Sequence, residues 1–273
     1  MSTVLKSFPI ALLLMAAAAR DAAAIDVVTH FLGGAPPANA AGAGTLPEIF
    51  DSAARRWASA YQDPFTIHLY FGWAPLGDAG THSLVEQGGV PGREILGTIL
   101  FDNSGSVSFF LDPTPDTNEE YRRYTEDFQE LGGGLINVAR VFSHPTGEAV
   151  GRCDLLSVAM HEIGHALGMC NANLSFMVER EDGAIRISGE YPHAGTVIPL
   201  ATNKYGVTSH FDPLQVLYGS VMSGVCGDER RIPSTLDILA NAQVSGFQIA
   251  SRIPSRSTTR PGNPYQGESV RGN

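Results

Sequence analysis

The spacing of apolar residues predicts two main helices. After Thr45, apolar side chains recur three or four positions apart, and a capping box with Glu48 marks the start of this helix. A second helix is predicted after Asp154, a suitable N-cap, from apolar residues at steps of four, three and four. The apolar positions are Phe50, Ala53, Ala54, Trp57 and Tyr61 in the first helix, and Leu156, Met160, Ile163 and Leu167 in the second.

Runs of β-branched and aromatic residues predict a sheet. The stretch from Asp102 to Gly105 suits a hairpin turn, whereas the acidic stretch 116–130 is expected to be an exposed helix or loop. Segment 236–247 should add a closing helix. We expect an α+β fold, in which a twisted mixed sheet, mostly parallel, carries two main helices and is followed by a smaller irregular C-terminal subdomain. The strand-like runs are 25–31, 65–71, 95–101, 107–111 and 135–142.

The composition is that of a globular chain. Of 273 residues, 43% are hydrophobic and 17% are charged, which is sufficient for one domain with a sizeable core. The formal net charge is −10, and lysine and arginine are scattered along the chain. This distribution argues against a nucleic-acid partner, because binding to a phosphate backbone needs clustered basic residues.

Residues 1–24 have the pattern of a cleaved signal peptide. The apolar run 8–19 precedes the small-residue stretch 22–24, and it is shorter than the about 20 residues that span a bilayer. The remainder divides into a domain at 25–250 and a polar tail at 251–273, which is expected to be disordered. We therefore expect a secreted or periplasmic monomer that has no membrane contact after cleavage.

The segment His161-Glu162-Ile163-Gly164-His165 is an HExxH motif on the second predicted helix. Two histidines four positions apart lie on one helix face and can bind one metal ion. The carboxylate of Glu162 can accept a proton from a water that zinc acidifies. The motif therefore predicts a zinc site with two histidine ligands and a general base. The alternative is that these histidines are ordinary core residues.

The run from His161 to Gly168, HEIGHALG, resembles the metzincin clan of metallopeptidases, whose extended motif HExxHxxGxxH ends in a third zinc ligand. Here that third position is Asn171, and a neutral amide is a poor zinc ligand. The segments around His210 and Met222 look like the leishmanolysin-type branch, in which an insertion separates the glycine from the third histidine.

This resemblance implies that His210 is the third ligand and that Met222 belongs to a methionine-containing turn below the metal. It also implies that the chain turns away from the helix at Gly168, and that a metzincin-like fold has its upper subdomain to about residue 168 and its lower subdomain after it. The competing candidates for the third ligand are His193, Glu179, Asp182 and Asp212.

Three cysteines, at 153, 170 and 226, allow at most one disulfide within the chain. Cys170 follows the motif helix and Cys226 follows the methionine-containing turn that the resemblance implies, so Cys170–Cys226 is the expected pair. Cys153 lies about 12 Å before His161 along the helix axis, which is too far to bind the same metal. Calcium binding by the acidic stretch 116–130 has no supporting motif.

These residues predict a zinc-dependent endopeptidase that acts on a protein or peptide substrate. One Zn²⁺ would be held by His161, His165 and His210, and Glu162 would activate water and protonate the leaving amine. The alternative is a secreted non-catalytic protein that uses the same histidines for a structural metal or for adhesion, which leaves Glu162 without a role. Hydrolysis of a non-peptide amide, or of small peptides only, is a third hypothesis.

Overall fold

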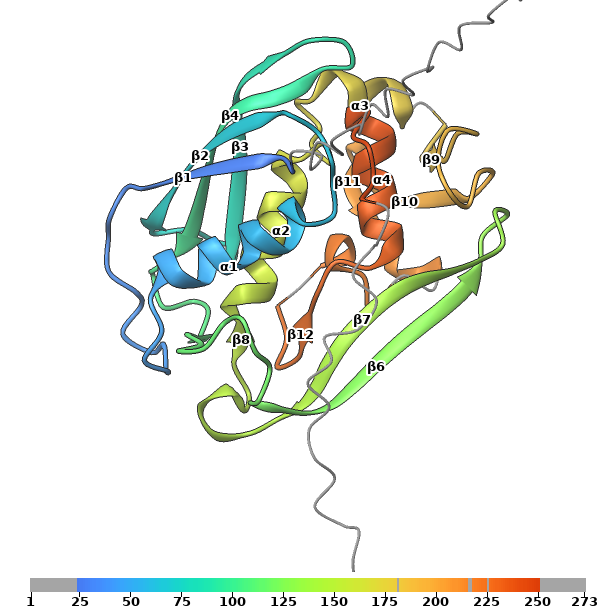
Figure 1. Ribbon diagram of the computed structural model, residues 1–273. Helices are drawn as coiled ribbons and strands as arrows, with labels where there is room; N and C mark the ends of the chain where they lie inside the picture. Colours follow the sequence, from blue (N-terminus) through green and yellow to red (C-terminus); the bar gives the residue numbers. More distant parts are fainter. Residues whose placement is uncertain (1–23, 181, 216–217, 225, 251–273) are drawn as a thin grey trace, which may run out of the picture.

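The computed structural model describes residues 24–250 except 181, 216–217 and 225 (Figure 1). Apart from Ala24, the predicted signal peptide lies outside these residues, and so does the predicted tail. The described chain is a mixed α+β structure with several sheets and four α-helices, which confirms the predicted fold class. None of the described helices is long and apolar enough to span a membrane.

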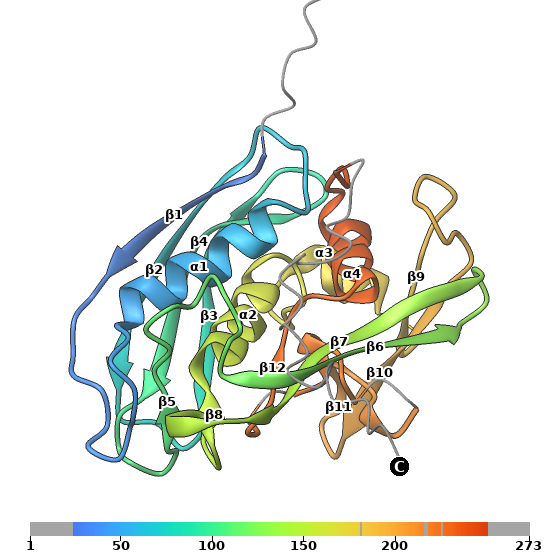
Figure 2. The same cartoon turned by 60° about the horizontal axis from the view of Figure 1, so that its bottom comes forward.

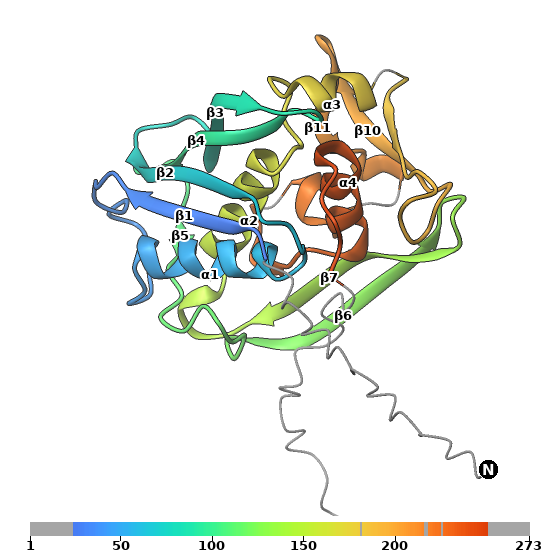
Figure 3. The same cartoon turned by 45° about the horizontal axis from the view of Figure 1, so that its top comes forward.

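The main sheet has the strand order β1-β2-β4-β3 (Figure 3). Strands β1 (Asp26–Phe31), β2 (Thr66–Ala74) and β4 (Arg93–Asp102) are parallel neighbours. The edge strand β3 (Gly80–Gly88) is antiparallel to β4. Two of the three pairings are therefore parallel, as predicted, although β3 itself was not predicted from the sequence.

Helices α1 (Leu46–Ala58) and α2 (Leu155–Ala166) pack against each other on one face of the main sheet (Figure 1). Phe50 of α1 stacks on Phe71 of β2, with 4.0 Å between the ring centroids. Trp57 is fully buried and donates its indole N–H to a backbone carbonyl of α2 at 2.8 Å. The apolar faces predicted for both helices are therefore the faces that form the core.

Local capping sets the ends of these helices. Thr45 accepts a hydrogen bond from the backbone N–H of Glu48 at 3.4 Å, and the carboxylate of Asp154 accepts one from Ser157 at 3.0 Å. Both predicted N-caps are confirmed. After α2 the chain turns at Gly168, whose φ of +149° is rarely adopted by other residues.

Strands β6 (Tyr121–Glu130) and β7 (Leu135–Pro145) form a long antiparallel hairpin along one side of the molecule, and β12 (Arg230–Arg231) pairs with β7 (Figure 2). The prediction of a helix or loop for 116–130 is wrong over residues 121–130. Most side chains of β6 are exposed, so the strand shows little apolar alternation. Its conformation comes from pairing with β7, a tertiary effect that outweighs local propensity.

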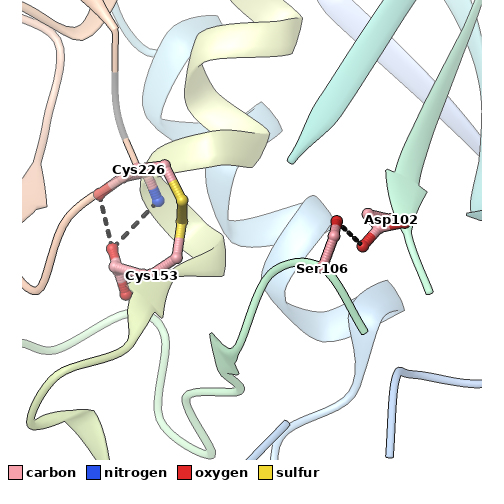
Figure 4. The surroundings of a disulfide bond; sticks show 6 residues. Asp102, Ser106, Cys153 and Cys226 are labelled. Carbon is pink, nitrogen blue, oxygen red and sulfur yellow. Dashed lines mark hydrogen bonds between the residues drawn. A yellow bond between two sulfur atoms is a disulfide. The ribbon is translucent and has the colours of Figure 1, made fainter. Parts of the chain in front are cut away.

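The predicted hairpin turn at 102–105 is also wrong, because β4 pairs with β2 and β3 and not with the next strand. The Asp102 carboxylate accepts a hydrogen bond from the Ser106 hydroxyl at 2.8 Å (Figure 4) and another from the backbone N–H of Ser104 at 2.9 Å. These bonds close a loop that leads to β5 (Phe109–Phe110), which pairs in parallel with β8 (Cys153–Asp154).

The C-terminal part contains a second sheet and two helices. Strands β9 (Ala184–Arg186), β10 (Val197–Asn203) and β11 (Gly206–Phe211) form an antiparallel sheet. Helix α3 (Leu174–Glu179) precedes it, and helix α4 (Thr235–Ser245) confirms the predicted closing helix. Short 3-10 turns lie at Gly147–Ala149 (η1), Pro213–Gln215 (η2) and Val221–Ser223 (η3).

A disulfide joins Cys153 to Cys226 (Figure 4), with 4.9 Å between their Cα atoms. Cys170 is a free thiol. The predicted pair Cys170–Cys226 is therefore wrong. Cys153 and Cys170 lie at opposite ends of α2, which is about 18 Å long. The segment around Cys226 runs beside the beginning of the helix, where the Asp154 N–H donates to the Gly227 carbonyl at 3.3 Å.

Removal of this disulfide by Cys153→Ser together with Cys226→Ser is expected to lower the free energy of unfolding by about 4 kcal/mol. The cross-link spans 73 positions, so its loss frees a large loop in the unfolded chain. Urea unfolding of the double variant measures the change. The single variant Cys170→Ser is the control and should unfold as the parent does; a double variant as stable as the parent would show that the cross-link does not restrict the unfolded chain.

Candidate metal centre

Three histidines from two parts of the chain meet at one point. His161 and His165 lie on α2, and His210 lies on β11. One ring nitrogen from each lies within 4.8 Å of the other two. The His161 Nε2 atom is 3.0 Å from the His165 Nε2 atom and 3.1 Å from the His210 Nε2 atom. The structure therefore brings together the three predicted ligands, close enough to bind one metal ion.

Backbone carbonyls orient the first two rings. The Nδ1 atom of His161 donates to the Val221 carbonyl at 2.7 Å, and the Nδ1 atom of His165 donates to the Met169 carbonyl. A neutral imidazole carries only one N–H, so both Nε2 atoms are left with lone pairs. Two acceptors cannot form a hydrogen bond with each other, so the 3.0 Å distance between the two Nε2 atoms is not one. Instead, the lone pairs of both atoms meet at one position.

Burial keeps these rings neutral. Burial, together with the neighbouring His210 ring, lowers the pKa of His161 to about 3. The pKa values of His165 and His210 also fall, in both cases mainly because of burial. Neutral imidazole is the form that binds a metal ion. The chain thus offers three unprotonated nitrogen ligands at neutral pH.

Three imidazole nitrogens in this arrangement can hold one metal ion, and zinc is one of the ions that such ligands suit. Imidazole nitrogens 2.0–2.1 Å from such an ion are about 3.3 Å from each other. The 3.0 and 3.1 Å separations at His161 Nε2 lie close to this value. Three protein ligands leave a fourth position open, which is the pattern of catalytic zinc sites and not of structural ones.

The competing ligands predicted from the sequence are absent from this cluster. In the part of the chain that the structure describes, no other group of three His, Cys, Asp or Glu residues is close enough to bind a metal. The carboxylate of Asp182 pairs with Arg186 at 2.5 Å, and that of Glu179 accepts a hydrogen bond from Gln243 at 3.3 Å. Neither His193 nor Asp212 joins the three histidines.

Glu162 is buried beside the histidines, between α2 and the edge strand β3. A Cβ atom at Gly80 would lie 2.8 Å from the Glu162 Oε1 atom, so the glycine leaves space for this carboxylate. Burial raises the pKa of Glu162 to about 7, an effect that His82 opposes and Asp78 supports. A carboxylate with a pKa in this range can both accept and return a proton near neutral pH.

The predicted methionine-containing turn lies below α2. Met222 is fully buried in η3, and its sulfur occupies the space that a side chain at Gly164 would fill. The same space is bounded by Trp57, whose Cζ2 atom would lie 3.1 Å from a Cβ at Gly164. This packing explains a glycine inside the helix, where it costs about 1 kcal/mol relative to alanine.

A buried carboxylate holds this turn in place. The Asp237 Oδ1 atom of α4 accepts hydrogen bonds from the Ser220 hydroxyl at 2.5 Å and from the Met222 N–H at 3.1 Å. Its second oxygen accepts from the N–H of Ser234 at 2.8 Å. The Val221 carbonyl, which orients His161, lies between these anchored residues. Helix α4 therefore fixes the turn whose carbonyl orients His161.

Two residues beside the metal centre, His82 and Glu94, were not predicted from the sequence. His82 on β3 has its ring centroid 6.4 Å from that of His165, and its Nε2 atom is 2.8 Å from the Oε1 atom of Glu94 on β4. Burial disfavours the charged form of His82, but Cys170 and Glu94 outweigh this effect and raise its pKa to about 9. The sequence contains no motif around His82, and only the prediction of β3 would have placed it here.

In comparisons with known proteins, no family model and no curated protein sequence matches this chain. Its function is therefore inferred from the geometry of the site.

Proposed function

We propose that this protein is a zinc-dependent endopeptidase. The observation that carries the proposal is the convergence of three neutral histidine nitrogens beside a buried glutamate of an HExxH helix. A structural metal site would need four protein ligands and no general base. Glu162 has a role only in the catalytic interpretation, because a carboxylate next to the first ligand is what activation of a water requires.

Among the residues of the chain, Glu162 would carry out the proton transfers of the reaction. When bound, zinc would supply a Lewis acid that polarises the scissile carbonyl and acidifies the attacking water. Glu162 would take the proton of that water and later deliver it to the leaving amine, so one carboxylate would serve both steps. The hydrogen bonds of His161 and His165 to backbone carbonyls would hold the ligands in one orientation through both steps.

We further propose a metzincin-type enzyme that is similar to the leishmanolysin branch. Three features support this assignment: the glycine at which the chain leaves α2, the late return of His210 on β11, and the buried Met222 under the ligands. The arrangement of a sheet with α1 and α2, followed by a part with mixed structure, agrees with upper and lower subdomains that divide near residue 168.

The proposal also includes export of the protein and a protein or peptide substrate. The pattern of residues 1–24 is that of a cleaved signal peptide, and a disulfide is typical of oxidising compartments. We propose a secreted or periplasmic monomer that hydrolyses protein or peptide substrates. The net charge of −10, with lysine and arginine scattered along the chain, argues against nucleic acid as a ligand.

Metal removal tests the proposal. The purified chain is expected to contain one zinc ion, and a chelator should stop its hydrolysis of an unfolded protein without unfolding it. Added Zn²⁺ should restore the activity. Circular dichroism during chelation separates this outcome from a structural role, in which loss of the metal unfolds the domain. Unfolding on chelation, or zinc-loaded protein without hydrolytic activity, would contradict a catalytic site.

A further inference from the structure

Two histidines lie close together on the outer face of the main sheet. His30 belongs to β1 and His68 to β2, and these parallel strands lie side by side (Figure 3). Alternate side chains of a strand point to opposite faces. Phe71 stacks on a ring of α1 and Thr29 bonds to Asp51 of α1 at 2.8 Å, so both histidines point away from the helices. Both imidazoles are half-buried, and solvent reaches them on this face.

The two rings bring one nitrogen each to the same place. The His30 Nε2 atom is 3.2 Å from the His68 Nδ1 atom, and the ring planes are inclined by only 14°. Two imidazole nitrogens that bind one ion at 2.0–2.1 Å are about 3.3 Å apart at a tetrahedral angle and about 2.9 Å apart at a right angle. The observed separation lies between these values. One ion can therefore bridge both nitrogens after a small rotation of the rings.

A tyrosine holds one of the two rings in place. The ring of His30 stacks on that of Tyr70, with 4.5 Å between the centroids and 19° between the planes. The strand register places His30 opposite Tyr70 and Val28 opposite His68, so the His30 side chain leans along the strand to reach His68. The stacking fixes this orientation before an ion arrives. Such preorganisation reduces the entropy that is lost on binding.

We propose that His30 and His68 form a second metal site, which binds a late first-row divalent ion such as Ni²⁺ or Cu²⁺. Imidazole suits these ions, and the affinity of a nitrogen site rises from manganese and iron to nickel and copper. Water would occupy the remaining positions, since both rings border the solvent. Two protein ligands bind more weakly than three, so this site should fill only after the three-histidine centre.

The ion would replace a hydrogen bond between the two rings. Without an ion, one neutral imidazole donates its N–H and the other accepts it. Binding of an ion needs a lone pair on both atoms, so the donating ring moves its proton to its other nitrogen. This change of tautomer leaves both rings neutral. Two coordinate bonds would then join the edge strand β1 to β2, which stabilises the folded chain.

Calorimetric titration of the zinc-loaded full chain with Ni²⁺ tests the proposal. Ni²⁺ is the probe because, unlike Cu²⁺, it does not oxidise the free thiol of Cys170. We expect one Ni²⁺ to bind while the zinc content stays unchanged. Both His30→Gln and His68→Gln should weaken this binding at least about a hundredfold, since loss of a group that only orients a ligand already costs about 10–100-fold. Tyr70→Ala should weaken it about tenfold, and Tyr70→Phe, which keeps the stacked ring, should bind as the parent does.

His144→Asn is the matched control, because this exposed histidine of β7 has a φ of +60°, which asparagine tolerates. It should bind Ni²⁺ as the parent does. In urea unfolding, Ni²⁺ at about a hundredfold its dissociation constant should lower the unfolding equilibrium constant of the parent about a hundredfold, but not that of His30→Gln or His68→Gln. The proposal is overturned if no Ni²⁺ binds beside zinc, if folded His68→Gln binds it as the parent does, or if His144→Asn loses as much affinity. Neither readout depends on peptidase activity.

Discussion

Replacement of Glu162 by glutamine is expected to leave zinc bound and to lower the hydrolysis of an unfolded protein by about a thousandfold. Glutamine has nearly the same shape and can occupy the space that Gly80 leaves, so the ligands should keep their positions. It cannot accept a proton from water. The measurement is kcat with a denatured protein substrate, together with the zinc content of the same sample.

Glu148→Gln is the matched control, because this exposed glutamate lies on η1, away from the cluster. Its activity should equal that of the parent. Full activity of Glu162→Gln with normal zinc content would rule out this residue as the general base, whereas loss of zinc would show that its role is to maintain the site.

The variant His210→Ala is expected to bind zinc at least about a hundredfold more weakly than the parent. Loss of a group that only orients a ligand already costs about 10–100-fold in affinity, so loss of a ligand should cost more. His210 comes from β11 whereas the other two ligands share α2, and a two-histidine site cannot reproduce a three-ligand geometry. Competition with a fluorescent chelator measures the dissociation constant.

His193→Ala provides the comparison, since this histidine follows α2 in the same C-terminal part but lies outside the cluster. It should bind zinc as the parent does. The assignment of the third ligand would be wrong if His193→Ala weakened zinc binding and His210→Ala did not.

The sequence predicts those parts of the site that depend on local periodicity. The faces and N-caps of α1 and α2 follow from apolar spacing and from Thr45 and Asp154, all of which are encoded within one or two helical turns. The HExxH pair is equally local, because the geometry of one helix places both rings on one face. Its partner His210 could be selected only through resemblance, since no short-range rule relates it to α2.

The parts that were missed depend on pairing between distant segments. Strand β3 is half polar and lies at the sheet edge, so its sequence shows no run of strand-forming residues. Without β3, neither His82 nor the space at Gly80 could be placed beside Glu162. The disulfide was mispredicted for a similar reason, because the position of Cys226 near the start of α2 depends on the path of the whole C-terminal part.

The candidate metal ligands lie on two elements, α2 and β11, which are separated in the sequence by a long intervening segment. After Gly168 the chain passes through α3, β9 and β10 before β11 returns His210 to the ligands on α2. Among the described residues after Gly168, Met169 contacts the ligand His165, the return strand supplies His210, and Asp237 anchors the turn at Met222. The intervening segment can therefore lengthen, shorten or change its surface while the chemistry stays in place, which makes it the region where selectivity for different substrates can diversify.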